Sequence, residues 1–373
     1  MALELTEEQT EAGWTVQKLG DIARVVTGGT PSKSNPEYWG EEVPFLTPSD
    51  QQFGVRLSVT ERFLSEEGAE GFAKKMVPAG AAALTCIGAT IGKISWTKEP
   101  TVTNQQINSV IAKTDTNGLY LYYKLSTCRD ALISMASGSA TPIVSKKLLE
   151  SLEVQIPPRA QQDKIAEVLG SLDDKIEANN TLLNSLDELG NALILQKIND
   201  VSETCELSEI AEVVMGQSPA GATLNEDSEG LIFYQGRRDF GFRYPTPRVF
   251  TSAPTRLAEP GDILLSVRAP VGDLNRTDEE CCVGRGIAAI RAKNSNTAQL
   301  FYLLKNMPNL WFPYEGEGTV FSSINRKQVQ NLRIPVVDNF EDFEDIEKSI
   351  LSLTQENLVL SETRDLLIRK LIK

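Results

Sequence analysis

The spacing of apolar side chains predicts two long amphipathic helices, one in the middle of the chain and one at its C-terminal end. After a Pro-Pro pair, apolar positions recur in steps of four and three from Ile165 to Leu193, and the same spacing returns from Ile346 to Leu371. Such spacing is typical of a coiled-coil seam, and the prolines mark a sharp helix start because proline is tolerated in a helix's first turn but not in its interior. We therefore predict long helices over residues 157–199 and 343–371, each with an apolar stripe that needs a partner.

Each seam contains a polar layer, and these layers predict how the helices pair. Counted from Ile165 to Gly190 and from Ile346 to Leu371, each seam has eight layers, and Asn179 is the fifth layer of the first seam and Asn357 the fourth of the second. Antiparallel pairing places the two asparagines opposite each other. Parallel pairing instead buries each amide against an apolar side chain, and each unsatisfied amide costs about 1–3 kcal/mol of stability. We predict an antiparallel coiled coil whose register is fixed by a hydrogen bond between Asn179 and Asn357. We also expect Arg364 to lay its stem along the seam and to hold its guanidinium in solvent.

The segments before the helices also repeat. The pattern L-x-x-I-A-x-V-V-x-G-x-[ST]-P begins at Leu19 and again at Leu207, and an Ile-Pro pair stands before each helix, at Ile156 and Ile334. Matches in the same order at two places in a chain indicate a tandem duplication. We therefore predict a pseudo-twofold internal repeat, with a first domain at residues 1–157, a spacer helix at 158–200, a second domain at 201–337 and a second spacer helix at 338–373.

Within each domain, short apolar runs between turn signals predict a mixed fold with a small twisted sheet. In the first domain we expect a loose tail at 1–13, a short helix or strand at 14–26, strands at 43–46, 81–87, 91–96, 102–112 (two short strands) and 153–156, and helices at 119–136 and 146–152. The second domain should follow the same plan. The fold class is therefore α+β, with two tandem globular domains separated by two long helices packed as an antiparallel coiled coil.

Composition narrows the function classes. Histidine is absent from all 373 residues, which removes the usual general base, the Ser-His-Asp triad and most metal sites. The five cysteines form no C-x-x-C pair and are typical of reduced cytoplasmic thiols rather than of disulfides or zinc ligands. No apolar run is long enough to cross a membrane, and the acidic N-terminus does not resemble a signal peptide. We therefore expect a cytoplasmic protein with no catalytic residues, no cofactor and no metal.

Three short strings resemble catalytic motifs but lack residues that the chemistry needs. The string Asn-Pro-Glu-Tyr at Asn35 resembles the N-P-P-Y string of amino-methyltransferases, but its third residue is Glu and no glycine-rich cofactor loop precedes it. The glycine-lysine string at Gly88 has three residues between its glycines, where a phosphate-binding loop needs four. The acidic string at Asp345 falls on the long-helix pattern, where a solvated helix face is the simpler interpretation. None of the three indicates an enzyme.

Polar and basic loop residues are the remaining candidates for a binding site. The clearest run is Gln-Gly-Arg-Arg-Asp-Phe-Gly-Phe-Arg from Gln235 to Arg243, because arginine pairs with guanine and glutamine with adenine. The net charge of −14 argues against strong DNA binding by the chain alone, so a partner should supply most phosphate contacts. Taken singly, each candidate could also be ordinary surface polarity. The candidate DNA contacts are Thr47, Ser49, Gln51, Arg56, Lys74, Lys75, Lys93, Gln105, Lys146 and Lys147 in the first domain, and Gln235, Arg237, Arg238, Arg243, Arg268, Arg285, Asn325 and Arg326 in the second.

Several strings together are similar to those of one family. W-x4-L-G-D-I-A begins at Trp14, G-G-T-P at Gly28, Y-W-G at Tyr38, P-P-x2-Q-Q-x-K-I-A-x-V-L at Pro157, and L-D-D-K-I-E-x-N at Leu172. In this order, and over nearly the whole chain, they resemble the specificity subunit of a Type I restriction–modification system. The second helix departs from this pattern, because it lacks both the Pro-Pro start and the Q-Q-x-K-I-A string.

The resemblance implies a function and a set of partners. Each globular domain is expected to be a target recognition domain that reads one half of a bipartite target in double-stranded DNA. The helices are expected to set the distance between the half-sites and to dock two modification (methyltransferase) subunits, which methylate adenine, while restriction (motor and nuclease) subunits cut DNA. The specificity subunit itself is expected to be non-catalytic. Two alternatives stay open: a tandem-domain protein-binding adaptor, which the acidic charge allows, and a DNA-modifying enzyme with unrecognised catalytic residues.

Overall fold

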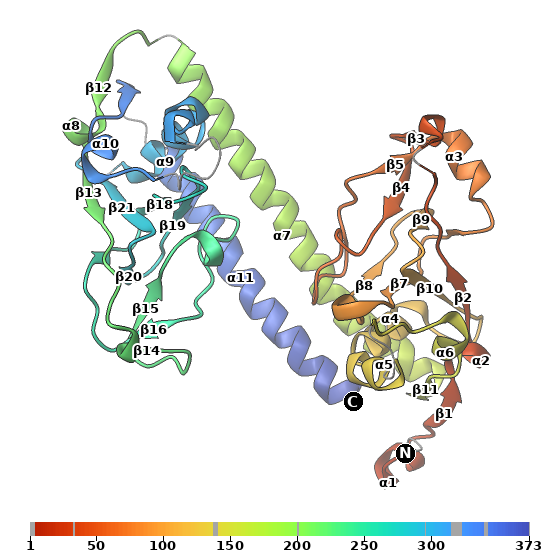
Figure 1. Cartoon of the computed structure of the whole chain (residues 1–373). Coiled ribbons are helices and arrows are strands. Elements are labelled where there is room, and N and C mark those ends of the chain that lie inside the picture. The colour runs from red at the N-terminus through yellow and green to blue at the C-terminus, as the bar shows by residue number, and fades with distance from the viewer. Residues whose placement is uncertain are drawn as a thin grey trace. The chain divides into compact units, whose positions relative to one another are not determined.

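The computed structural model describes residues 4–32, 34–136, 141–199, 201–294, 296–314, 323–338 and 342–372. The chain divides into two compact units, unit 1 with Met1–Glu177 and Leu358–Lys373, and unit 2 with Ala178–Asn357. Two long helices, α7 (Arg159–Asn199) and α11 (Asp342–Leu371), each contribute to both units (Figure 1). Each unit therefore combines one globular part with a segment of each long helix. No helix in the described ranges is long and apolar enough to cross a membrane.

The globular part of unit 1 contains two larger sheets and a two-stranded ribbon. One sheet has the order β2-β10-β7-β8, the other β3-β5-β4-β9-β6, and the ribbon pairs β1 with β11. Neighbouring strands are antiparallel except β4 and β9, which are parallel. The elements are α1 (Glu7–Glu11), β1 (Thr15–Lys18), α2 (Leu19–Ile22), β2 (Ala23–Thr27), η1 (Pro36–Tyr38), β3 (Trp39–Gly40), β4 (Val43–Leu46), β5 (Phe63–Leu64), α3 (Glu66–Gly71), β6 (Met76–Val77), β7 (Ala82–Thr85), η2 (Gly88–Thr90), β8 (Ile94–Trp96), β9 (Thr101–Thr103), β10 (Ile107–Ala112), α4 (Gly118–Ser126), α5 (Arg129–Met135), α6 (Lys146–Glu150) and β11 (Glu153–Ile156).

The core of unit 1 joins the four-stranded sheet to helix α4 and to the start of α7. Leu84 of β7 and Tyr120 and Leu121 of α4 are at most 1% exposed. They belong to one apolar cluster with Ile165 and Leu169 of α7. Burial of an apolar side chain of this size contributes about 1.5–3 kcal/mol. The first seam residues of the long helix are therefore held against the globular part of the same unit.

The globular part of unit 2 repeats this topology strand for strand. Its sheets have the orders β13-β21-β18-β19 and β14-β16-β15-β20-β17, its ribbon is β12-β22, and β15 and β20 form its parallel pair. The predicted duplication and the α+β class are confirmed. The elements are β12 (Thr204–Glu206), α8 (Leu207–Ile210), β13 (Ala211–Met215), η3 (Gly221–Thr223), β14 (Leu224–Asn225), β15 (Leu231–Tyr234), η4 (Arg237–Asp239), β16 (Phe250–Thr251), β17 (Leu257–Ala258), β18 (Ile263–Ser266), β19 (Leu274–Arg276), β20 (Cys281–Val283), β21 (Ile287–Ala292), α9 (Thr297–Lys305), η5 (Pro308–Leu310), η6 (Phe312–Tyr314), α10 (Arg326–Gln330) and β22 (Arg333–Pro335).

One lysine in each unit shows that the repeat extends to single hydrogen bonds. The backbone N of Lys113 donates to the Ile22 carbonyl at 2.8 Å, and that of Lys293 donates to the Ile210 carbonyl at 2.8 Å. The Nζ atoms of both lysines also donate to carbonyl groups of the same short helices, α2 and α8. Carbonyl groups at a helix end have no partner inside the helix, so each lysine satisfies groups that would otherwise need water.

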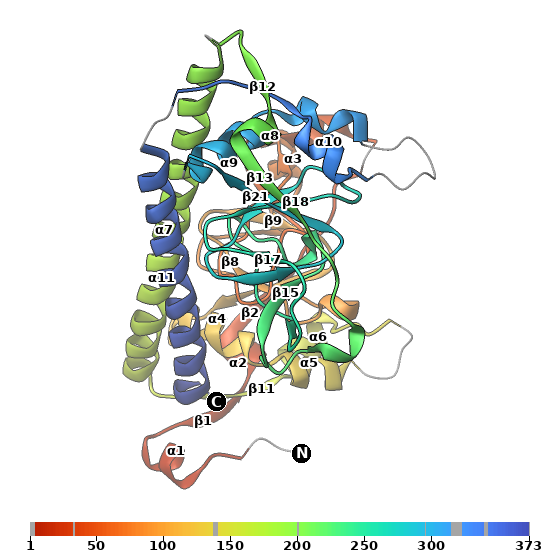
Figure 2. The same ribbon diagram turned by 90° about the vertical axis from the view of Figure 1, so that its left-hand side faces the viewer.

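The two long helices pair at their polar layer as the seam predicts. In unit 2, Nδ2 of Asn179 donates to Oδ1 of Asn357 at 2.9 Å, and Asn179 is 2% exposed. Helix α7 passes from unit 1 into unit 2 and α11 passes back, so they run in opposite directions, and Figure 2 shows them side by side. The predicted hydrogen bond is confirmed, and its role in fixing the register stays a prediction.

Arg364 differs from its expectation. Its side chain belongs to unit 1, where the residue is 7% exposed and Nη1 donates to Oδ1 of Asp173 at 2.7 Å. The guanidinium is therefore held inside the unit and does not reach solvent. A nearby carboxylate replaces the hydration that the charge would otherwise need.

Three local expectations also differ from the structure. Residues 7–11 of the expected tail form α1, because Thr6 and Gln9 make a capping box. The single helix expected at 119–136 is broken into α4 and α5, and at the break Oγ1 of Thr127 donates to the Lys124 carbonyl at 2.7 Å. A hydroxyl that bonds to a nearby carbonyl competes with the helical ladder. The one small sheet expected in each domain is in fact two sheets and a ribbon.

Candidate nucleic-acid interface

In unit 1 the glycine-rich turn after β2 is held against the end of β9. The backbone N of Gly29 donates to the Thr103 carbonyl at 2.8 Å, and a Cβ on Gly28 would lie 2.2 Å from that same oxygen, so only glycine fits there. This close approach brings Thr30 to the turn between β9 and β10, where its Oγ1 donates to Oε1 of the exposed Gln105 at 2.5 Å. The glycines therefore place the Thr30 hydroxyl where it holds the side-chain amide of Gln105.

The equivalent turn of unit 2 has the same geometry. A Cβ on Gly216 would lie 2.1 Å from the Gly284 carbonyl oxygen. Just after this glycine, Oγ of Ser218 donates to Oε1 of Gln235 at 2.8 Å and accepts from Nε of Arg285 at 3.4 Å. Both Gln235 and Arg285 are exposed. Three loops, which leave the ends of β13, β15 and β20, therefore meet at one serine.

Gln105 and Arg285 occupy the same place in the two repeats. Each lies between the last strand of the parallel pair and the strand that follows, and each is held by the hydroxyl of a G-x-[ST]-P turn. A glutamine whose Oε1 accepts one hydrogen bond keeps two donors and a lone pair, and an arginine bonded through Nε keeps both Nη groups. These are the groups that pair with the edges of adenine and guanine. The arrangement therefore orients the amide of Gln105 and the guanidinium of Arg285, two groups that are able to pair with bases.

Thr30 and Ser218 belong to the candidate site, and the sequence reasoning missed them. Neither was among the candidate contacts, because a short hydroxyl side chain gives no signal of DNA binding by itself. The signal that could have found them is the repeat, since G-x-[ST]-P keeps a hydroxyl beside a tight glycine turn in both copies.

The other exposed candidates differ in how they are held. Arg237 pairs with Asp273, while Arg238 beside it is exposed. Nζ of the half-buried Lys93 donates to the Pro48 carbonyl at 3.1 Å. Nζ of the exposed Lys75 lies 5.7 Å from the centroid of the Phe72 ring. The remaining exposed candidates are Ser49, Lys74, Lys146, Lys147, Arg268, Asn325 and Arg326.

Four candidates are buried, which corrects their assignment as DNA contacts. Gln51 is 0% exposed, and its Nε2 donates to the Ala83 carbonyl at 2.7 Å inside the domain. Thr47 is 5% exposed and bonds within its own turn. Arg56 and Arg243 are 7% and 1% exposed and pair with carboxylates of α7. The sequence places all four in polar loops, but it does not show which distant groups fold against them.

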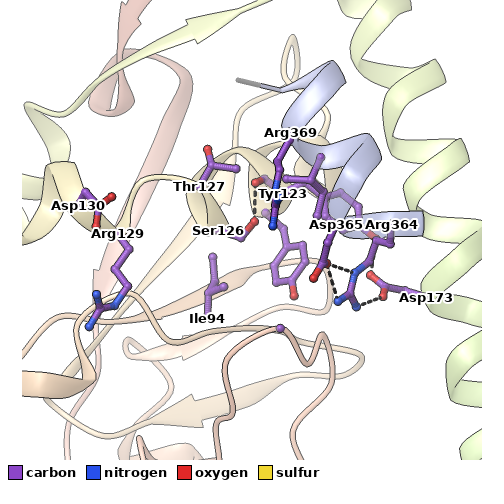
Figure 3. A pocket seen from close by; sticks show the side chains of 13 residues that line it. Ile94, Tyr123, Ser126, Thr127, Arg129, Asp130, Asp173, Arg364, Asp365 and Arg369 are labelled. Atoms are coloured by element: carbon purple, nitrogen blue, oxygen red, sulfur yellow. Dashed lines mark hydrogen bonds and ion pairs between the residues drawn. The ribbon is translucent and has the colours of Figure 1, made fainter. Parts of the chain in front are cut away.

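A cavity of about 360 Å³ in unit 1 is lined in part by an ion-pair cluster of Asp173, Arg364 and Asp365 (Figure 3). In its wall, Asp173 accepts from Nη1 of Arg364 at 2.7 Å and from the hydroxyl of Tyr123 at 2.6 Å. Burial acts to lower the pKa of Arg364, but bonds to Asp173 and Asp365 outweigh it and hold that pKa above its ordinary value. These paired charges therefore have a structural role in this part of the wall. Within the described residues, no cluster of metal-ligating side chains is large enough to hold a metal ion.

The duplicated α+β unit, with a polar turn in each copy and two long helices that enter both units, defines a tandem-domain scaffold. The family model described as the type I restriction modification DNA specificity domain matches residues 11–188 and again residues 199–351. The chain therefore belongs to the family of type I restriction–modification DNA specificity proteins, and it carries the family's domain twice.

Individual relatives agree with this membership. The chain is 27% identical over 369 residues to a provisionally assigned type I restriction enzyme specificity subunit, MjaX of Methanocaldococcus jannaschii, a match that covers 88% of this chain and 85% of that protein. It is 32% identical over 190 residues to the HindI specificity subunit of Haemophilus influenzae, covering 50% of this chain and 41% of that protein. The crystal structure of a Type I restriction–modification S subunit from M. genitalium matches with a TM-score of 0.64 at 15% identity, over 100% of this chain and 98% of that one. At that identity the structural match shows the fold alone.

Proposed function

We propose that this chain is the DNA-recognition subunit of a type I restriction–modification complex, and that each globular part reads one half of a bipartite target. The observation that carries the proposal is the polar turn at equivalent positions of both units, with Thr30 and Gln105 in one and Ser218 and Arg285 in the other. Two such turns on separate units suit a target that is split into two parts.

Gln105 and Arg285 are the principal base-reading residues in this proposal. Glutamine pairs with adenine through N6 and N7, and arginine pairs with guanine through O6 and N7, each contributing about 1–3 kcal/mol of discrimination. In unit 2, Gln235, Arg237 and Arg238 extend the reading surface. Exposed lysines such as those at positions 74, 75, 146 and 147 suit phosphate oxygens and act on all sequences alike.

Partners supply the chemistry in this proposal. Modification subunits methylate adenine, restriction subunits cut DNA, and the chain itself is non-catalytic. The relative HindI is a specificity subunit of a type I restriction enzyme, and MjaX is provisionally assigned as one, which supports this division of roles. The net charge of −14 supports it too, because a strongly acidic chain needs partners to neutralise phosphates.

A reciprocal exchange of the two reading residues tests the proposal. Gln105→Arg and Arg285→Gln are introduced separately into the full chain, each variant is assembled with its modification subunits in cells, and methylated adenines are mapped across the genome. We expect Gln105→Arg to replace adenine by guanine at one position of one half-site. Arg285→Gln should make the opposite change in the other half-site, with preferences altered by roughly 5–150-fold.

The two-stranded ribbons supply matched controls. Gln17→Arg on β1 and Arg333→Gln on β22 make the same exchanges at equivalent ribbons away from the turns, and they should leave the motif unchanged. An unmodified chain that directs no methylation to a bipartite motif would refute the proposed function. A bipartite motif that neither exchange alters would refute only the assignment of Gln105 and Arg285.

A further inference from the structure

The buried arginines Arg56 and Arg243 occupy equivalent positions in the repeat. The carbonyl of Arg56 accepts from the backbone N of Trp96 at 2.8 Å, and the carbonyl of Arg243 accepts from the backbone N of Arg276 at 2.8 Å. Trp96 and Arg276 are the last residues of β8 and β19, which are the matching edge strands of the two four-stranded sheets. The duplication has therefore kept one buried arginine at the same point of each globular part.

In unit 1 this arginine reaches α7. Nε of Arg56 donates to Oε1 of Glu177 at 2.8 Å, and its Nη2 pairs with Asp174. The side chain of Arg56 is 6% exposed. Burial acts to lower the pKa of Arg56, but its bonds to Glu177 and Asp174 outweigh burial and raise that pKa. The guanidinium is therefore a permanent charge that must keep its two carboxylate partners.

In unit 2 the equivalent arginine reaches both long helices. Nη2 of Arg243 pairs with Asp187 of α7 and donates to the hydroxyl of Tyr302 at 3.0 Å, while Nε lies 3.3 Å from Oε1 of Glu347 on α11. Its guanidinium carbon lies 4.2 Å from the centroid of the Phe301 ring. These partners contact the planar guanidinium of Arg243 from several sides. The flexible ammonium group of a lysine cannot make the same set of contacts.

Each arginine lies within a loop that begins at the proposed reading surface. Arg56 is in the loop between β4 and β5, and Arg243 is in the loop between β15 and β16, which also carries Gln235, Arg237 and Arg238. Each loop is therefore fixed at its start by β4 or β15, and further along by an arginine that pairs with carboxylates of the long helices. A buried ion pair of this kind adds little net stability over apolar packing, but it tolerates only one geometry.

We propose that Arg56 and Arg243 are positioning residues that lock each recognition loop to the spacer helices and so limit the gap lengths that the chain accepts between its two half-sites. The inference rests on the proposed function. A loop that is held both by its strand and by this arginine transmits the spacing of the helices to the residues that contact bases. A loop released from the helices lets its domain adapt to a neighbouring spacing.

The test uses the full chain assembled with its modification subunits. DNA substrates carry both half-sites at the preferred gap, or at a gap one base pair shorter or longer, and the methylation rate is measured on each. Arg243→Lys keeps the charge and loses the planar fork. We expect the ratio of the rate at the preferred gap to the rates at the neighbouring gaps to fall roughly tenfold, with the half-site sequences unchanged.

Arg248→Lys is the matched control. Arg248 lies in the same region of unit 2, but within the described ranges it pairs with Asp239 and Glu226 of its own globular part and not with a long helix. Arg248→Lys should leave the gap profile unchanged.

Arg56→Lys is the second variant. It alters the anchor in unit 1 and should also widen the range of accepted gaps, so the inference can be tested even if Arg243→Lys does not fold. Equal loss of methylation at every gap in the folded lysine variants, or an unchanged ratio, would show a merely structural role and overturn the inference. A wild-type complex without a bipartite motif would instead overturn the proposed function.

Discussion

Tyr123 and Tyr302 stand at matching positions on α4 and α9, yet they bond to opposite charges. The hydroxyl of Tyr123 donates to the carboxylate of Asp173 at 2.6 Å, and the hydroxyl of Tyr302 accepts from the guanidinium of Arg243 at 3.0 Å. A phenol can do both, because its oxygen is donor and acceptor at once. The two units therefore keep one tyrosine scaffold, which bonds to a carboxylate in unit 1 and to a guanidinium in unit 2.

Tyr123→Phe should destabilise unit 1, because it removes the donor from a buried carboxylate. Hydrogen bonds to charged groups contribute about 1.5–3 kcal/mol, and we expect a loss of that size in urea unfolding followed by tryptophan fluorescence. Tyr122→Phe is the control, because its ring is similarly buried and its hydroxyl makes no hydrogen bond within the described residues. It should change stability by less than about 0.5 kcal/mol. Equal losses in the two variants would contradict the assigned hydrogen bond.

Single residues were predictable only where their neighbours lie close in sequence. Gln105 and Arg285 were chosen because they stand in polar turns, and the structure leaves both exposed. Arg56 was chosen for the same reason, but its partners lie on α7, more than a hundred residues further along the chain. Nothing near Arg56 in the sequence shows that Glu177 folds against it. Burial of a charge is therefore a property of long-range packing that local reasoning cannot supply.

At the scale of elements, the long helices were predictable and the sheet pairing was not. A coiled-coil seam repeats within a few residues, so the bounds of α7 and α11 and the meeting of Asn179 with Asn357 follow from spacing alone. The parallel pairing of β4 with β9 joins strands that residues 47–100 separate in the sequence. Short strands can pair in many orders, and only packing of the complete domain selects one. The second, five-stranded sheet of each unit was missed for this reason.

The asparagine layer of the coiled coil should behave as a coupled pair. Asn179 and Asn357 bond to each other, and further bonds reach Glu356 and Asn180. Replacing either asparagine with leucine removes the hydrogen bond between them and sets the remaining amide against an apolar side chain, whereas replacing both removes the mismatch. In urea unfolding, we expect the double variant to lose less free energy of unfolding than the sum of the two single losses, by about 0.5–3 kcal/mol.

A second cycle provides the control for this coupling. Asn184 is exposed on α7 and lies about a turn beyond the asparagine layer. The losses from Asn184→Leu and Asn357→Leu should add within about 0.5 kcal/mol. If the losses from the Asn179 and Asn357 variants also added within this limit, the hydrogen bond between the two residues would not fix the register.

At the scale of the whole molecule, the duplication explains how an acidic chain can still select a sequence. The net charge of −14 leaves little general attraction for DNA, so discrimination must come from a few oriented contacts. Two such turns on one chain combine two weak readings, because linking two binding units raises the effective concentration of the second. The benefit depends on the spacing between the units, and the continuous helices α7 and α11 are the only elements that enter both among the described residues.

Shortening both long helices together should therefore shorten the gap in the DNA target. Removing residues 178–184 from α7 and 352–358 from α11 deletes one heptad from each helix, and both deletions take out the asparagine layer and the leucine layer beside it. The spacer loses about 10.5 Å, which corresponds to roughly three base pairs. In genome-wide mapping of methylated adenines, the shortened chain should keep both half-site sequences with a gap reduced by about three base pairs.

Deleting the heptad from α7 alone is the control, because it mismatches the two seams and should abolish methylation. A doubly shortened chain that methylates the original gap would show that the helices do not set the spacing.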